Sequence, residues 1–231
     1  MYARGVSADD RKPELDALRE RLREDLQPVA PMRPLAPLLL GALALAGLGA
    51  AVLASRWGLR SDRSDLGPWI FWGLTLIQAA MALPLFAGAA RGALPAPALR
   101  AARISVLTAS AVFIAVCAMT LTARAGTLSL PADKRLAEGF LCFGVEFALG
   151  LPIALWSGLI LARGFPAAPA GAGLLAGLAA ALLADACWRL ICPFGEAGHV
   201  VPSHGAGMLL LVALTTAGAV LWGVRRRSRI G

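Results

Sequence analysis

Long apolar runs without charged residues occupy most of the chain. Three of them lie between Arg33 and Arg56, between Asp65 and Arg91, and between Arg103 and Arg124. Each is close to or above the ~20 residues with which an α-helix crosses a lipid bilayer. These runs predict the first three membrane-spanning helices.

Three further runs follow in the second half of the chain. Gly139–Ala162 is interrupted only by Glu146, Gly164–Ala184 extends to about Ile191, and Gly205–Val224 is the last. The expected fold is therefore an all-α, polytopic bundle of about six transmembrane helices joined by short loops. The pattern divides the chain into a tail (1–34), a transmembrane domain (35–224) and a basic C-terminus (225–231).

Composition agrees with a membrane location. Of 231 residues, 58% are hydrophobic and only 16% are charged, which is more apolar than an ordinary soluble domain. The net charge of +8 could indicate nucleic-acid binding, but the basic residues are scattered at the ends of apolar runs and form no stripe. We therefore expect the lipid bilayer as a partner and no direct binding of nucleic acid.

The distribution of basic residues predicts the orientation. With six spans, fifteen Lys and Arg residues lie on the side of the two termini and seven on the opposite side. The positive-inside rule then places both termini in the cytoplasm. The first apolar run begins only near Leu35, behind a polar segment, so we expect no signal peptide.

The N-terminal tail contains one amphipathic segment, PELDALRERLREDLQ, at residues 13–27. Its leucines recur at steps of three and four residues and form one apolar stripe on a helix: Leu15, Leu18, Leu22 and Leu26. A lone helix of this length is marginal in water, so the stripe requires a partner surface. That surface is either another protein, the loops of the bundle itself, or a second copy in a short coiled coil.

Several polar and reactive side chains share one depth at the predicted outer ends of spans three to six. The charged members form an expected intramembrane cluster of Glu146, Asp185 and Arg189. Asp185 and Arg189 are four residues apart on one helix face and can form an ion pair. A carboxylate within a span also raises the hypothesis of a functional site, whereas the structural interpretation is contact between helices.

The four cysteines differ in their expected roles. Cys117 lies within span three and is expected to pack as a small hydrophobe. Cys187 and Cys192 are poorly spaced for a disulfide, whereas Cys142 and Cys192 reach the same boundary and form the credible redox pair. His199 and His204 follow closely. Together, Cys142, Cys192, His199 and His204 are candidate ligands for a soft or borderline metal ion, although no cofactor is required and the spacing matches no standard zinc motif.

The chain resembles the NrsF-type family of membrane anti-sigma factors, which are bacterial inner-membrane proteins of six spans. The resemblance rests on the leucine-striped tail followed by DLQPVAPMRPLAP, on GFLCFGVEFALGLPIAL and on WRLICPFGEAGHVVPSH. It implies that the tail binds an extracytoplasmic-function sigma factor of the sigma F kind. It also implies that two periplasmic cysteines, corresponding to Cys142 and Cys192, take part in sensing metal or oxidative stress.

Other functional classes have less support in the sequence. A small transporter or channel could use the charged residues within the spans, but no inverted repeat or pair of broken helices is evident. A membrane thiol oxidoreductase would require a second cysteine pair or a CxxC motif. Ser203 beside His204 lacks a placed acid and base for hydrolysis. We therefore expect a regulatory protein and no enzyme.

The predicted orientation can be tested by cysteine labelling. In a cysteine-free variant, single cysteines introduced into the first and third loops should react with a membrane-impermeant thiol reagent in intact spheroplasts. Cysteines at the N-terminus or after Trp222 should react only after the membrane is permeabilised. Labelling of the tail in intact spheroplasts would reverse the orientation.

Overall fold

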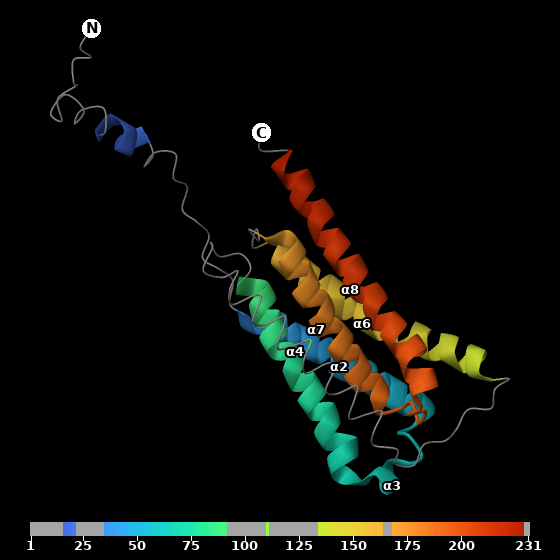
Figure 1. Cartoon of the computed structure of the whole chain (residues 1–231). Coiled ribbons are helices and arrows are strands. Elements are labelled where there is room, and N and C mark those ends of the chain that lie inside the picture. The colour runs from blue at the N-terminus through green and yellow to red at the C-terminus, as the bar shows by residue number, and fades with distance from the viewer. Residues whose placement is uncertain (1–15, 22–34, 92–109, 111–133, 164–167, 229–231) are drawn as a thin grey trace. The chain divides into compact units, whose positions relative to one another are not determined.

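The computed structural model describes residues 16–21, 35–91, 110, 134–163 and 168–228. Contacts divide the chain into two compact units, Met1–Arg33 and Pro34–Gly231, and each is considered by itself. In the first unit, residues 16–21 are helical. The second unit consists of α2 (Leu35–Trp57), α3 (Arg63–Pro68), the π-helix η1 (Trp69–Gly73), α4 (Leu74–Arg91), α6 (Arg135–Arg163), α7 (Pro169–Arg189) and α8 (Ala197–Arg227) (Figure 1).

The predicted all-α fold is confirmed in the part of the chain that the structure describes, where every regular element is a helix. Five stretches are long and apolar enough to cross a membrane: Leu35–Trp57, Arg63–Ala90, Leu136–Arg163, Pro169–Arg189 and Gly198–Arg226. They correspond to five of the six predicted spans. The remaining predicted span, between Arg103 and Arg124, lies outside the described residues.

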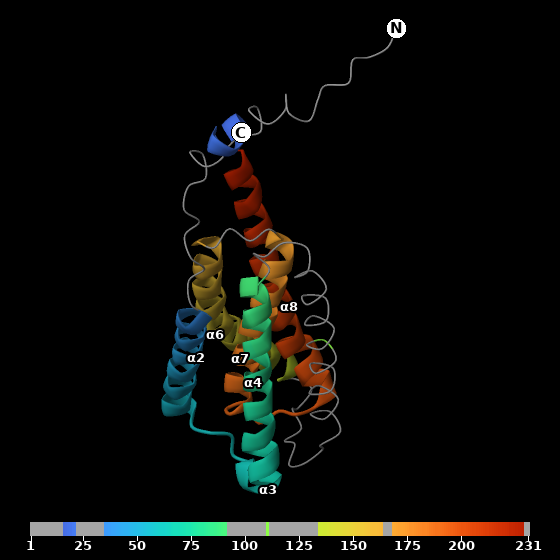
Figure 2. The same ribbon diagram turned by 90° about the vertical axis from the view of Figure 1, so that its left-hand side faces the viewer.

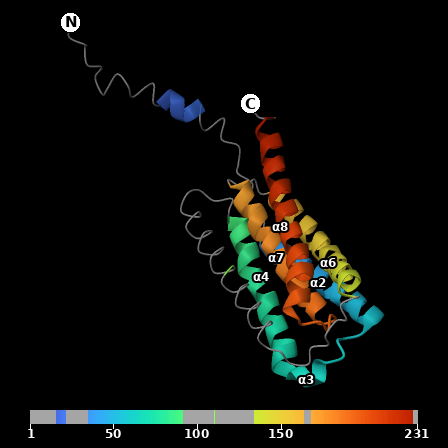
Figure 3. The same ribbon diagram turned by 45° about the vertical axis from the view of Figure 1, so that its right-hand side comes forward.

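Helix α7 is the central helix of the bundle. It contacts α2, α4, α6 and α8 (Figure 2). In its most apolar stretch 67% is buried, against 17–39% in the corresponding stretches of the other four spans. Seen from another direction, α4 and α8 lie on either side of it (Figure 3). The outer helices expose large apolar side chains, such as Leu40, Leu155 and Leu209, as expected for surfaces that face lipid.

Small residues allow α7 and α8 to approach closely. Gly173 and Gly177 form a GLLAG sequence, a GxxxG pattern that brings helix backbones together in membranes. A Cβ atom on Gly177 would lie 2.9 Å from the Cα of Val212, and one on Gly173 would lie 2.9 Å from the carbonyl oxygen of Thr215. The backbone of α8 therefore occupies the space that a side chain would need.

The second predicted span is bent at its start. Gly67 has φ +71°, a left-handed conformation that is easily adopted only by glycine, and Pro68 follows it. The chain then passes through the π-helix Trp69–Gly73 before α4 begins. Pro84 and Pro152 lie within α4 and α6, as predicted.

The last helix begins earlier than its apolar run. The sequence places the start of the sixth span at Gly205, whereas α8 starts at Ala197 and carries Pro202 within it. The prediction was wrong because the residues before Gly205 include polar and proline positions that interrupt the hydrophobic signal. His199 therefore belongs to the first turn of α8, and His204 lies further along the same helix.

Substitution at the contact between α7 and α8 should destabilise the bundle. Gly177→Leu forces a side chain against the backbone of α8 and should lower the free energy of unfolding by about 1–3 kcal/mol. Thermal unfolding of the protein in detergent measures this. Gly171→Leu is the matched control on the same helix, because a Cβ there meets nothing within 4 Å. Equal effects of the two variants would contradict the close approach.

Candidate metal centre and its polar neighbours

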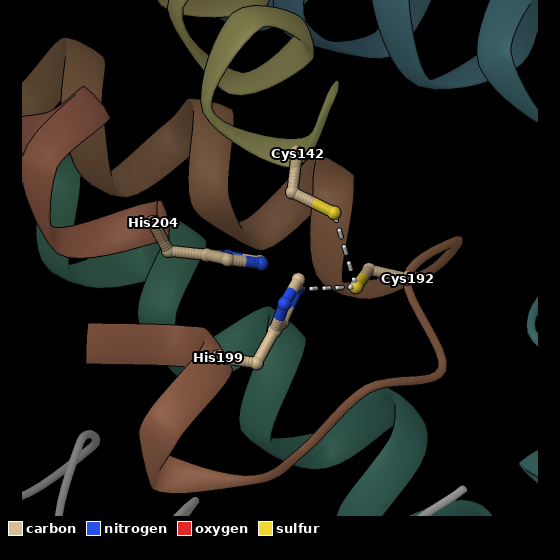
Figure 4. A group of neighbouring side chains, drawn as sticks. All are labelled: Cys142, Cys192, His199 and His204. Carbon is tan, nitrogen blue, oxygen red and sulfur yellow. Dashed lines mark hydrogen bonds between the residues drawn. The ribbon is translucent and has the colours of Figure 1, made fainter. Parts of the chain in front are cut away.

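Four candidate ligands converge at one end of α6, α7 and α8. Cys142 lies in the second turn of α6, and Cys192 lies three residues after the end of α7. His199 and His204 are presented by α8 (Figure 4). One ligand atom from each of the four residues lies within 4.8 Å of the others, and all four residues are buried.

The two thiols are in direct contact and are not joined by a disulfide. The Sγ atoms of Cys142 and Cys192 are 3.8 Å apart, and both cysteines are free. The Sγ atom of Cys192 lies 3.7 Å from Nε2 of His199. The structure therefore brings together the two cysteines that the sequence paired, and it places an imidazole against one of them.

His204 connects this group to two carboxyl groups, that of buried Glu146 and that of half-buried Asp185. Its Nδ1 atom lies 2.7 Å from Oδ1 of Asp185 and 3.2 Å from Oε2 of Glu146. Asp185 is the closer acceptor, and both oxygens of Glu146 are buried without a hydrogen-bond partner among the described residues. The Nε2 atom of His204 is likewise buried without such a partner, which leaves this nitrogen available on the side of the thiols.

Gln78 of α4 completes the polar neighbourhood. Its side-chain amide donates a hydrogen bond to Oδ2 of Asp185. Gln78 is almost fully buried, and it places a polar group from α4 in the same cluster. Asp185 thus accepts hydrogen bonds from α4 and α8 while it lies on α7 between them.

A buried ion pair holds the segment that carries Cys192. Arg60 and Asp62 form a bidentate pair with distances of 2.5 and 2.7 Å. The guanidinium of Arg60 also donates to the carbonyl oxygen of Pro193 at 3.3 Å. The backbone N–H of Arg60 donates to the carbonyl oxygen of Leu190 at 3.0 Å. The loop after α2 is therefore fastened to the turn on both sides of Cys192.

The environment of Cys192 favours its protonated form. The pKa of this thiol lies above its ordinary value, first because of its contact with the Cys142 thiol and second because of burial. Only the thiolate is a strong nucleophile. The Cys192 sulfur therefore carries its proton at neutral pH in this environment.

The remaining predicted site residues have different placements. Arg189 lies one turn after Asp185 on α7. The other two members of the expected intramembrane cluster, Glu146 and Asp185, both contact Nδ1 of His204. Cys187 points elsewhere and donates to the carbonyl of Ala46 at 3.4 Å. Of the tail leucines, Leu18 lies in the described helical turn, whereas Leu15, Leu22, Leu26 and also Cys117 lie outside the described residues.

Sequence reasoning missed three participants, namely Gln78, Arg60 and Asp62. Gln78 could have been predicted from the sequence, because it is the single amide side chain in the apolar run between Asp65 and Arg91. Arg60 and Asp62 had none, since they belong to a charged loop whose contact with Pro193 bridges 133 residues.

Comparison with known proteins gives one family. The family model described as NrsF, negative regulator of sigma F, matches residues 22–223, nearly the whole chain. No curated protein and no solved structure matches.

Proposed function

The chain belongs to the NrsF family of negative regulators of sigma F, and we propose that it is a membrane-bound anti-sigma factor that sequesters an extracytoplasmic-function sigma factor. The proposed site of sequestration is the N-terminal cytoplasmic helix. The proposed trigger for release is periplasmic metal or oxidative stress, sensed by Cys142 and Cys192. The protein would then lie in the bacterial inner membrane with its N-terminus in the cytoplasm. The match across residues 22–223 carries the regulatory part of this function.

The tail supports the binding role through the exposure of its helix. The described side chains of residues 16–21 are all exposed, and Leu18 retains 54% of its accessible surface. Asp16 and Arg19 form a helical ion pair at 3.5 Å, one turn apart. An exposed leucine on a charged helix is suited to an apolar groove of a partner protein with a basic rim.

The thiol pair supports the sensing role. The contact of 3.8 Å between two free, buried thiols is the single observation that carries this part of the proposal. Two such thiols can bind a soft or borderline metal ion or be oxidised, and His199 and His204 are candidate further ligands. Either event changes how α6, the segment after α7 and α8 meet. Release requires that this change favour the sigma-free state of the tail.

Transport is the alternative function. Its sequence basis is the charged cluster, and in the structure Asp185 is bonded to His204 and Gln78. The arrangement gives no reason to prefer a permeation path over a fixed polar network.

Truncation of the leucine stripe should abolish sequestration. The double variant Leu18→Ala, Leu22→Ala removes the centre of the stripe, and each buried leucine contributes on the order of 2 kcal/mol at a well-packed contact. Sigma factor recovered by pull-down from detergent extracts should fall by roughly 100-fold or more, and the regulon should become constitutively active.

Ala17→Ser is the control, because Ala17 lies on the opposite face of the predicted helix. Unchanged recovery of sigma factor by the double variant, at normal membrane abundance, would contradict the binding role of the leucine stripe and leave the tail helix with a structural role only.

Replacement of either sensor cysteine should separate sequestration from induction. Cys142→Ser and Cys192→Ser should keep the regulon silent but prevent its activation by cadmium or an oxidant, because each removes one of two thiols in contact. Reporter output and membrane abundance should be measured together. Cys187→Ser and Cys117→Ser should behave as the unmodified protein.

Two other results would count against the sensor. Normal induction in both Cys142→Ser and Cys192→Ser would show that these cysteines are not the sensor. Low abundance with constitutive activation would instead indicate that the two thiols only fasten the bundle.

A further inference from the structure

We propose that Cys142, Cys192, His199 and His204 form a closed, four-coordinate site for one divalent cation of the zinc type, and that Asp185 is the residue that positions His204 for it. This inference builds on the proposed function, because it names the chemical class of ligand for the sensor and extends the site to a residue outside it. Three features of the described residues support this site.

The first feature is the spacing of the ligand atoms. Zinc binds thiolate sulfur at about 2.3 Å and imidazole nitrogen at about 2.0–2.1 Å, and a tetrahedron with these radii has sulfur–sulfur edges of about 3.8 Å and sulfur–nitrogen edges of about 3.6 Å. The observed separations are 3.8 Å between the two sulfurs and 3.7 Å between Cys192 and His199. These two separations match two edges of such a tetrahedron, and the ligand atoms of all four residues lie within 4.8 Å of one another.

The second feature is the tautomer of His204. The carboxyl group of Asp185 lies 2.7 Å from Nδ1 of His204, and the tautomer that suits this contact has the proton on Nδ1, which donates to the carboxyl oxygen. In a neutral imidazole, Nε2 then has a free lone pair. This atom is buried without a hydrogen-bond partner among the described residues, a costly arrangement that a bound cation would resolve. A carboxylate behind a ligating histidine is the usual outer shell of a zinc site.

The third feature is burial combined with charge. All four ligands are buried, which matches the closed character of a structural zinc site. Binding displaces one proton from each thiol to the solvent, and two thiolates with two neutral imidazoles then balance a divalent cation. The ion and its four ligands would thus add no net charge to an apolar bundle, where an unbalanced charge is expensive. Two sulfurs and two nitrogens favour zinc-like ions over magnesium or calcium.

Cobalt(II) is a suitable optical probe for the site. The full-length protein in detergent, stripped with a chelator under reducing conditions, should bind one Co²⁺ per chain with intense visible bands of tetrahedral coordination and a sulfur-to-cobalt charge-transfer band. Zn²⁺ should displace it. Cys142→Ser and Cys192→Ser should each lose about half of the charge-transfer intensity, whereas Cys187→Ser should retain all of it.

The positioning role of Asp185 has its own test. Asp185→Asn should weaken Co²⁺ and Zn²⁺ binding by about 10–100-fold, while the cobalt spectrum at saturation stays the same because no ligand has changed. Asp65→Asn, at an exposed position of α3, is the control and should bind as the unmodified protein. An unaltered affinity in Asp185→Asn would overturn its role.

A measurement on the unmodified chain avoids the risk that a variant misfolds. Zn²⁺ should protect Cys142 and Cys192 from alkylation, read by mass spectrometry, relative to Cys187 in the same molecule. Equal alkylation with and without Zn²⁺, or cobalt bound without a sulfur band, would overturn the site.

These results are independent of the proposed function. If metal does not bind and yet the cysteine variants lose induction, the site is wrong and the sensor works through thiol oxidation. If metal binds as described and the variants are induced normally, the site stands and the proposed sensor fails.

Discussion

A hydrogen-bonding group buried in an apolar bundle must find its partner in the protein, because lipid offers none. His204 meets this constraint for Asp185 through Nδ1, whereas both oxygens of Glu146 have no hydrogen-bond partner among the described residues. One ring nitrogen faces Asp185 of α7 and Glu146 of α6, and the other is left on the side of the two thiols and His199. The polar groups contributed by α6, α7 and α8 are thereby gathered at one place, while buried hydroxyl groups elsewhere, such as those of Thr75 and Ser157, donate to carbonyls of their own helices.

The concentration depends on the close approach of α7 to its neighbours. Because Gly173 and Gly177 have no side chains, the backbone of α8 lies directly against α7, and Asp185 can reach His204 with a short carboxylate. The ion pair of Arg60 and Asp62 acts at the end of α7, where it fixes the turn on both sides of Cys192. Packing of α7 against α8 therefore sets the depth of the site. The ion pair of Arg60 and Asp62 sets the position of Cys192, the ligand that lies outside the helices.

Much of this could be predicted from the order of residues. Charge-free runs of sufficient length indicated the spans, and alternating helix directions placed Cys142, Glu146, Asp185 and Cys192 at one depth. The direction in which each side chain points could not be predicted, because the hydrophobic pattern around these helices is nearly uniform. The start of α8 was obscured by Pro202 and the polar residues before it, so the helical position of His199 was missed. The contact of Arg60 with Pro193 was beyond reach, since nothing local relates two loops 133 residues apart.

The order of the four ligands along the chain has a consequence for biogenesis. Cys142 precedes Cys192 by 50 residues, and both histidines come later still. At a synthesis rate of about 5–20 residues per second, the Cys142 thiol waits several seconds before its partners emerge from the ribosome. A chain that stops before α8 has inserted contains the cysteines but neither imidazole. The completed cluster therefore distinguishes a chain that includes α8 from one that ends before it.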